Sequence, residues 1–367
     1  MNEFPSVDPI PLPAPVWLLK ALHVTTLSLH FVAVEILLGG LLVAVLLNLL
    51  AKSRESRTGA YAMARRLPVV MTYVINLGVP PLLFAQVLYG RALYTSSVLI
   101  GAYWIAVIFL LMACYWLLYR FAQGLEEGRK VWWIGLAAWL LAGGIARIYS
   151  SNMTLMLRPE AWRGMYSASA SGAHLPQGDP TLDPRWLLML TGGLLVAGLW
   201  MMYLSGRSTF TENERRYLAG LGGKLTASMA LVQILMARLA VGIQPEAVRV
   251  GIGTNALYAY AGMAWLAAMA LVLAMGAFAG FRKRTSDWIS WGAALFALVA
   301  MASLTIYRDG IRDLTLLSKG FDVWQRTVVT NWSVVILFLV LFVAGLAAAG
   351  WLVSVVARAR KTMEGLA

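Results

Sequence analysis

The sequence predicts an all-α membrane protein, a polytopic bundle of about nine transmembrane helices. Composition is the first indication: 60% of the 367 residues are hydrophobic and 13% are charged, whereas about 25% of a typical soluble domain is charged. The mean hydropathy of +0.72 is the second. The third is that apolar runs of roughly 18 or more residues, long enough to cross a bilayer as a helix, recur along the whole chain. We expect a single integral membrane domain over residues 1–367.

The predicted spans are apolar runs, and basic clusters separate them in the manner of membrane loops. The first run is much longer than the roughly 20 residues that a bilayer requires, so we expect it to project at one end. In order, the spans cover residues 16–50, 68–90, 97–120, 131–150, 185–205, 218–242, 256–280, 287–307 and 331–357. The clusters that follow the first, third, fifth, seventh and ninth spans are Lys52–Arg66, Arg120–Lys130, Arg207–Arg216, Arg282–Arg284 and Arg358–Lys361.

The distribution of basic residues also predicts the orientation. Seventeen Lys and Arg residues lie in these five clusters, and ten lie in the loops on the opposite side. Because the side richer in basic residues is normally cytoplasmic, we expect the N-terminus outside and the C-terminus in the cytoplasm of a bacterial inner membrane. This alternation requires an odd number of spans, which favours nine. The net charge of +13 is not gathered into one patch, which argues against nucleic-acid binding.

Three further features are the N-terminal segment, the two long outer loops and the single cysteine. Met1–Pro15 is acidic and proline-rich, without the basic region of a cleaved signal peptide. The long outer loops Ser150–Pro184 and Tyr307–Thr330 are predicted to form a docking surface for partner proteins. The single cysteine, Cys114, excludes a disulfide framework, a zinc site and a covalent haem c attachment. Any haem must therefore be bound non-covalently.

Ionisable residues in the first span are the main candidates for function. His23, His30 and Glu35 lie in an apolar run, where such groups are costly and normally functional. The two histidines are seven residues apart and share nearly the same helix face. Neutral histidine is a common haem ligand, so His30 is a candidate axial ligand to a haem iron, with His23 as a weaker one. Alternatively, each histidine hydrogen-bonds a neighbouring helix.

No second axial ligand is evident, because no other histidine lies in a span. Met153 is the candidate methionine, although methionine also fills apolar cores. Glu35 is either a proton-relay carboxylate or an ion-pair partner of Arg238, the one arginine deep in a span. The outer arginines suit haem propionates, and they equally suit the acidic residues near them. These arginines are Arg147, Arg158, Arg308 and Arg312.

The segment Leu29–Gly39, with its His30-Phe31 pair, apolar run and glycine, resembles the first helix of cytochrome bd oxidase subunit I. In that family, this motif supplies an axial haem ligand near the outer surface. Nine spans and an outside N-terminus also fit the family. Three later stretches keep the family's order of motifs, and they are Asn76–Val79 with Phe84–Gly90, Ser151–Met156 with Pro159, and Leu190–Gly193 with Val196–Gly198.

Departures from the family pattern limit what the resemblance implies. The family's fifth-span histidine would fall near Trp186–Leu188, and its third-span glutamates near Val107 and Cys114–Tyr115, where neither residue type occurs. The quinol-binding loop is reduced to Gly242–Asn255, and only Ile306–Gly310 echoes the family's Glu-x-Gly-Arg-Gln-Pro-Trp motif. Only His30 carries over as a haem ligand. The resemblance therefore implies a divergent relative rather than a complete quinol oxidase.

These observations leave three functional hypotheses. The first is a respiratory electron-transfer subunit that holds haem b through His30, associates with other integral membrane subunits, and exchanges electrons with a periplasmic c-type cytochrome or a quinone. The second is a haem-free scaffold that anchors partner redox subunits in the lipid bilayer. The third is a proton-coupled transporter that uses Glu35, Arg238 and the histidines, although the sequence lacks the paired repeats of many transporters. No residue of the chain is assigned a catalytic role.

Overall fold

The computed structural model describes residues 10–50 and 52–364, which form an all-α bundle. Eight of its helical segments are long and apolar enough to cross a membrane. The expected class, a polytopic helical membrane protein, is therefore confirmed. The long helices are α1 (Val16–Leu49), α3 (Leu67–Leu99), α4 (Gly101–Glu126), α5 (Trp132–Leu155), α7 (Leu182–Ser205), α8 (Glu212–Gly242), α10 (Ala256–Arg282) and α11 (Asp287–Ser318).

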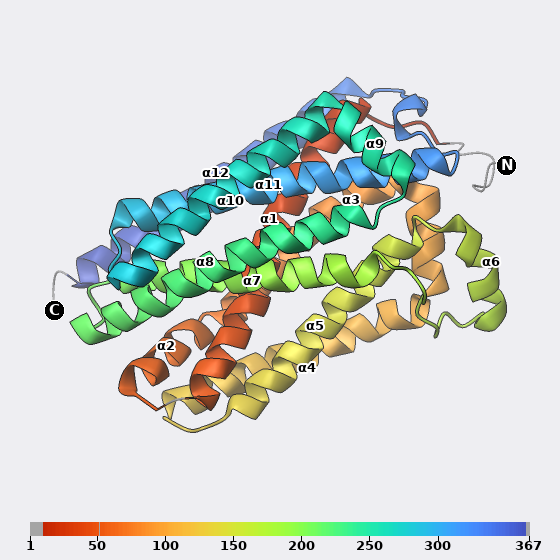
Figure 1. Cartoon of the computed structure of the whole chain (residues 1–367). Helices are drawn as coiled ribbons and strands as arrows, with labels where there is room; N and C mark the ends of the chain where they lie inside the picture. The colour runs from red at the N-terminus through yellow and green to blue at the C-terminus, as the bar shows by residue number, and fades with distance from the viewer. Residues whose placement is uncertain (1–9, 51, 365–367) are drawn as a thin grey trace.

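Short helices connect these elements, and the ninth predicted span falls on a further helix. In its described part, that helix, α12 (Trp332–Glu364), carries the shorter apolar segment Trp332–Ala348. Its start lies beside the start of α1, because Leu12 and Val328 form a β-bridge. Its end lies at the opposite end of the bundle (Figure 1). The short elements are α2 (Arg54–Ala64), α6 (Pro159–Ala168), α9 (Glu246–Thr254) and the 3-10 helix η1 (Val323–Gln325).

Local sequence explains several helix boundaries. The Thr211 side chain accepts from the backbone N–H of Glu214, whose carboxylate accepts in turn from the backbone N–H of Thr211, so a complete capping box begins α8. The Asn255 side chain caps α10 in a similar way. Within α3, the backbone leaves helical geometry at Tyr89, with φ −124° and ψ 30°, and the helix is kinked there. The kink places a fully buried tyrosine near the N-terminal end of α1.

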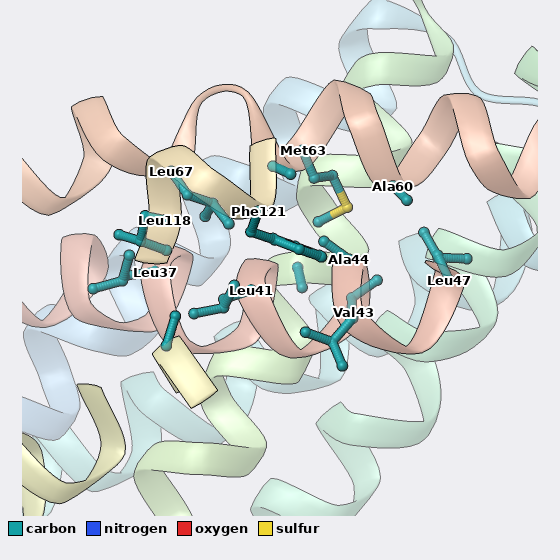
Figure 2. Packing of buried hydrophobic residues seen from close by; sticks show 14 of the residues in the cluster. Leu37, Leu41, Val43, Ala44, Leu47, Ala60, Met63, Leu67, Leu118 and Phe121 are labelled. Atoms are coloured by element: carbon teal, nitrogen blue, oxygen red, sulfur yellow. The ribbon is translucent and has the colours of Figure 1, made fainter. Parts of the chain in front are cut away.

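Helix α1 is the central element of the bundle. It crosses between a group formed by α2, α4 and α5 and a second group that contains α7, α8, α10 and α11 (Figure 1). The C-terminal half of α1 packs into the main apolar core, where Figure 2 shows Phe121 of α4 and Met63 of α2 directed toward α1. With 34 residues, α1 is about 51 Å long, against a hydrocarbon core of about 30 Å. This length agrees with the expected projection.

Glycines allow the second group of helices to approach closely, as small residues commonly do in membrane bundles. A Cβ atom on Gly223 of α8 would overlap the backbone of Gly280 in α10. A Cβ on Gly39 of α1 would overlap the carbonyl of Gly193 in α7 in the same way. The first contact sets the distance between α8 and α10, and the second sets the distance between α1 and α7.

The structure differs from the expectation for the loop Tyr307–Thr330. Helix α11 continues to Ser318, so its charged stretch, including Asp309 and Arg312, is helical and buried rather than part of a docking loop. The physical reason is that these charges are neutralised by one another and by Lys20 of α1. A hydropathy window treats every charge as exposed to lipid and therefore ends the span too early.

Candidate functional site

The His30 side chain is held in one tautomer by α3. Its Nδ1 lies 3.1 Å from the carbonyl oxygen of Val74. Because a carbonyl only accepts hydrogen bonds, Nδ1 carries the proton and Nε2 keeps its lone pair. Histidines that bind metals commonly donate their second N–H to a carbonyl in this way. Gly78 makes room for the ring, since a Cβ there would lie 3.0 Å from the His30 Cε1.

Arg308 of α11 places a positive charge close to His30. Its guanidinium Cζ lies 4.8 Å from the ring centroid of Phe31, the residue next to His30. Among the described residues, no carboxylate lies within ion-pair distance of Arg308, whereas Arg312 and Arg158 both have acidic partners. An unpaired, partly buried guanidinium favours an anionic group beside it. Of the two alternatives for this arginine, a haem propionate or a nearby acid, the described residues therefore provide no acidic partner for Arg308.

His23, by contrast, has both ring nitrogens engaged. Its Nδ1 donates to the carbonyl oxygen of Pro81 at 3.0 Å, and its Nε2 accepts from the Arg312 guanidinium at 2.8 Å. The ring therefore bridges α3 and α11, as in the alternative in which an intramembrane histidine bonds to neighbouring helices. To bind iron, Nε2 would first have to lose its bond to Arg312.

Beside His23 lies a buried ion cluster, formed by Lys20, Tyr89, Asp309, Arg312 and Asp313. The Lys20 ammonium is 2.8 Å from Asp309 Oδ2, 2.5 Å from Asp313 Oδ2 and 2.6 Å from the Tyr89 hydroxyl. The Arg312 guanidinium pairs with Asp309 at 3.2 Å. Two cations thus face two carboxylates, and the Trp324 indole also donates to Asp313. The cluster joins α1, α3 and α11 at the end of the bundle where α1 begins.

Sequence reasoning missed Lys20 although a signal for it exists. A lysine in an apolar span requires a counter-ion. Asp309 and Asp313 are four residues apart and so share one helix face. That spacing indicates a pair of carboxylates available to one cation.

Glu35 lies deep in the bundle and has no ion-pair partner among the described residues. Its residue exposure is 7%, and its carboxyl packs against Gly192 of α7. Arg238 is exposed on α8, and no ion pair joins it to Glu35 in the described part of the chain. The carboxyl lines a cavity of about 30 Å³ between α1, α7, α8, α10 and α11.

The remaining predicted site residues lie elsewhere. Arg147 pairs with Asp183 at 2.5 Å and lies over the Trp186 ring, 5.8 Å from its centroid. Met153 is partly buried against a second apolar core, which contains Leu155 and Met156. In the described part of the chain, no hydrogen bond, ion pair or ring contact joins either residue to His30. Residues 10–50 and 52–364 contain no group of three or more His, Cys, Asp or Glu side chains placed to hold a metal ion.

The fold and these contacts define a class, the multi-pass helical membrane proteins with ionisable residues buried between the helices. The comparisons with known proteins add no family. No protein-family model matches the chain, and no curated protein matches it.

Proposed function

We propose that this chain is an electron-transfer subunit of a respiratory complex in a bacterial inner membrane and that it holds a b-type haem through His30. The supporting observation is the His30 imidazole, whose Nδ1–H donates to the carbonyl oxygen of Val74 while no described residue hydrogen-bonds its Nε2. The resemblance of Leu29–Gly39 to the first helix of cytochrome bd oxidase subunit I supports the same assignment. A haem supplies a one-electron redox centre when it is bound.

Each residue at this site has a defined task under the proposal. His30 offers Nε2 to the iron, and the Val74 carbonyl holds the ring orientation and increases its basicity. Arg308 fits a propionate, because it has no acidic partner of its own among the described residues. Phe31 positions that guanidinium through a cation–π contact. The chain exchanges electrons with a periplasmic c-type cytochrome or a quinone. It associates with other integral membrane subunits of the complex.

Replacing His30 with alanine is expected to abolish the b-type absorbance of the purified native assembly, because the axial ligand is lost. The measurement is the reduced-minus-oxidised spectrum together with haem extraction. Two histidine controls should keep the spectrum: His174→Ala, in an exposed loop, and His23→Gln, at the ring already bound to Arg312. In His30→Gly, added imidazole should restore part of the absorbance.

The result also separates the two leading hypotheses. An unchanged spectrum in His30→Ala would refute the proposed ligand. A native assembly that contains the chain but has no haem assigned to it would instead favour the haem-free scaffold.

A further inference from the structure

The cavity beside Glu35 lies near the middle of the membrane domain. Glu35 is the twentieth of the 34 residues of α1, and the cavity is bounded by five different helices. The glycine at position 192 creates space for the carboxyl, since a Cβ there would overlap Glu35 Oε1. The carboxyl is thus accommodated between α1 and α7 rather than directed toward lipid.

Among the described residues, no charged side chain other than Glu35 lines the cavity. Of the residues that line the cavity, Gln233 of α8 is the polar partner, and α7, α10 and α11 contribute apolar side chains and Gly192. An isolated ionised carboxylate in such surroundings costs far more than a neutral acid, so the neutral acid is the stable form. The apolar lining residues are Leu195, Val196, Trp265, Met269, Ala297, Ala300, Met301 and Leu304.

The hydrogen bonds of Gln233 favour the same protonation state. Its Nε2 donates both to the carbonyl oxygen of Leu188 and to the Thr191 hydroxyl, the latter at 2.7 Å. The carbonyl of Leu188 can only accept, which fixes the orientation of the amide. Both amide protons are therefore used by α7, and neither remains to donate to an ionised Glu35.

The cavity also has room for water. A water molecule requires about 10–15 Å³ of such space and two or more polar partners. The volume of about 30 Å³ meets the first requirement, and the Glu35 carboxyl and the Gln233 amide meet the second. A proton leaving Glu35 can pass to this water, which becomes hydronium while the acid becomes a carboxylate. The reverse transfer restores the acid and the water.

We propose that Glu35 is a proton-binding site at the centre of the membrane domain, protonated at rest and exchanging its proton with water in the cavity that it shares with Gln233. This assignment goes beyond electron transfer and does not depend on haem. It also separates Glu35 from Arg238, with which it was first grouped. The paired carboxyls of the ion cluster, Asp309 and Asp313, serve as an internal comparison because Lys20 contacts both.

The first experiment uses dicyclohexylcarbodiimide, an apolar reagent that adds to protonated carboxyls and leaves a stable acylurea. The full chain in detergent is treated with the reagent, and its peptides are identified by mass spectrometry. We expect an adduct at Glu35, its loss in Glu35→Gln, and no adduct at Asp309 or Asp313, whose carboxylates are ion-paired. Labelling should decrease as the pH of the medium is raised.

Infrared spectroscopy decides the case in which the reagent cannot reach the cavity. The unlabelled protein should show a protonated carboxyl C=O band that is lost in Glu35→Gln and retained in Glu246→Gln, a control at an exposed position. In D₂O the band should shift to lower frequency, because the carboxyl proton exchanges. Absence of this band would overturn the protonated state, and a band that does not shift would overturn exchange with water. His30→Ala should leave the band unchanged, so loss of haem cannot be mistaken for failure of this proposal.

Discussion

Lys20→Met is expected to lower the free energy of unfolding by about 3–5 kcal/mol, because it leaves buried charge without its partner. Lys20 has a residue exposure of 5% and contacts two carboxylates and a tyrosine hydroxyl. Without its ammonium group, Asp309 and Asp313 face each other with the single compensating charge of Arg312. The measurement is the unfolding equilibrium of the purified chain in mixed detergent micelles.

A second variant tests this explanation. In Lys20→Met/Asp313→Asn, one cation and one carboxylate remain, so we expect much of the lost stability to return. The control Lys224→Met removes a lysine from an exposed position on α8 and should change stability by no more than about 0.5 kcal/mol. If the double variant were no more stable than Lys20→Met, charge balance would not be the reason for the effect.

The helical bundle was predictable because each span depends on its own local composition. Eight predicted spans coincide with long apolar helices, since a run of about 20 apolar residues has few alternatives to a membrane helix. The end of α11 was not predictable in the same way. Asp309 is buried by pairing with Lys20, which lies 289 residues earlier in the chain. A local window contains no information about that partner.

The residue types in the sequence predict which side chains are candidates for the site, but they do not predict which residues those side chains contact. His30, His23 and Glu35 stand out because they are ionisable residues in an apolar span. Which histidine keeps a ring nitrogen without a hydrogen bond depends on the register between α1 and its neighbours. Val74 uses one nitrogen of His30 and no described residue uses the other, whereas Pro81 and Arg312 use both nitrogens of His23.

The Glu35–Arg238 pair, one of the two alternatives for Glu35, illustrates the same limit. Arg238 and Gln233 both lie on α8, five residues apart, which places them about 140° apart around the helix. Because the Gln233 side faces the cavity, Arg238 lies on the exposed side. Hydropathy shows that an arginine is deep in a span, but the side that it faces depends on the packing of α8 against α7 and α10.

Gly39→Ala is the second substitution that is expected to cause a large loss of stability, because Gly39 of α1 lies against the backbone of Gly193 in α7. A Cβ at this position would overlap the carbonyl oxygen and carbon of Gly193, so the obstacle is backbone and cannot move by changing a rotamer. Helices α1 and α7 would have to separate, which also disturbs the adjacent contact between Glu35 and Gly192. Overpacking usually costs about 1–3 kcal/mol, and a backbone clash belongs at or above the upper end. Unfolding in mixed micelles measures the loss.

A matched glycine separates this steric effect from helix propensity. At Gly144 in α5, an added Cβ meets no described atom within 4 Å, so Gly144→Ala is expected to leave stability unchanged or to increase it by up to about 1 kcal/mol. Alanine favours helix at both positions, and only the contact with α7 distinguishes them. Equal stability of the two variants would mean that α1 and α7 are not in backbone contact at Gly39. The space assigned to Glu35 beside Gly192 would then have to be larger than the structure shows.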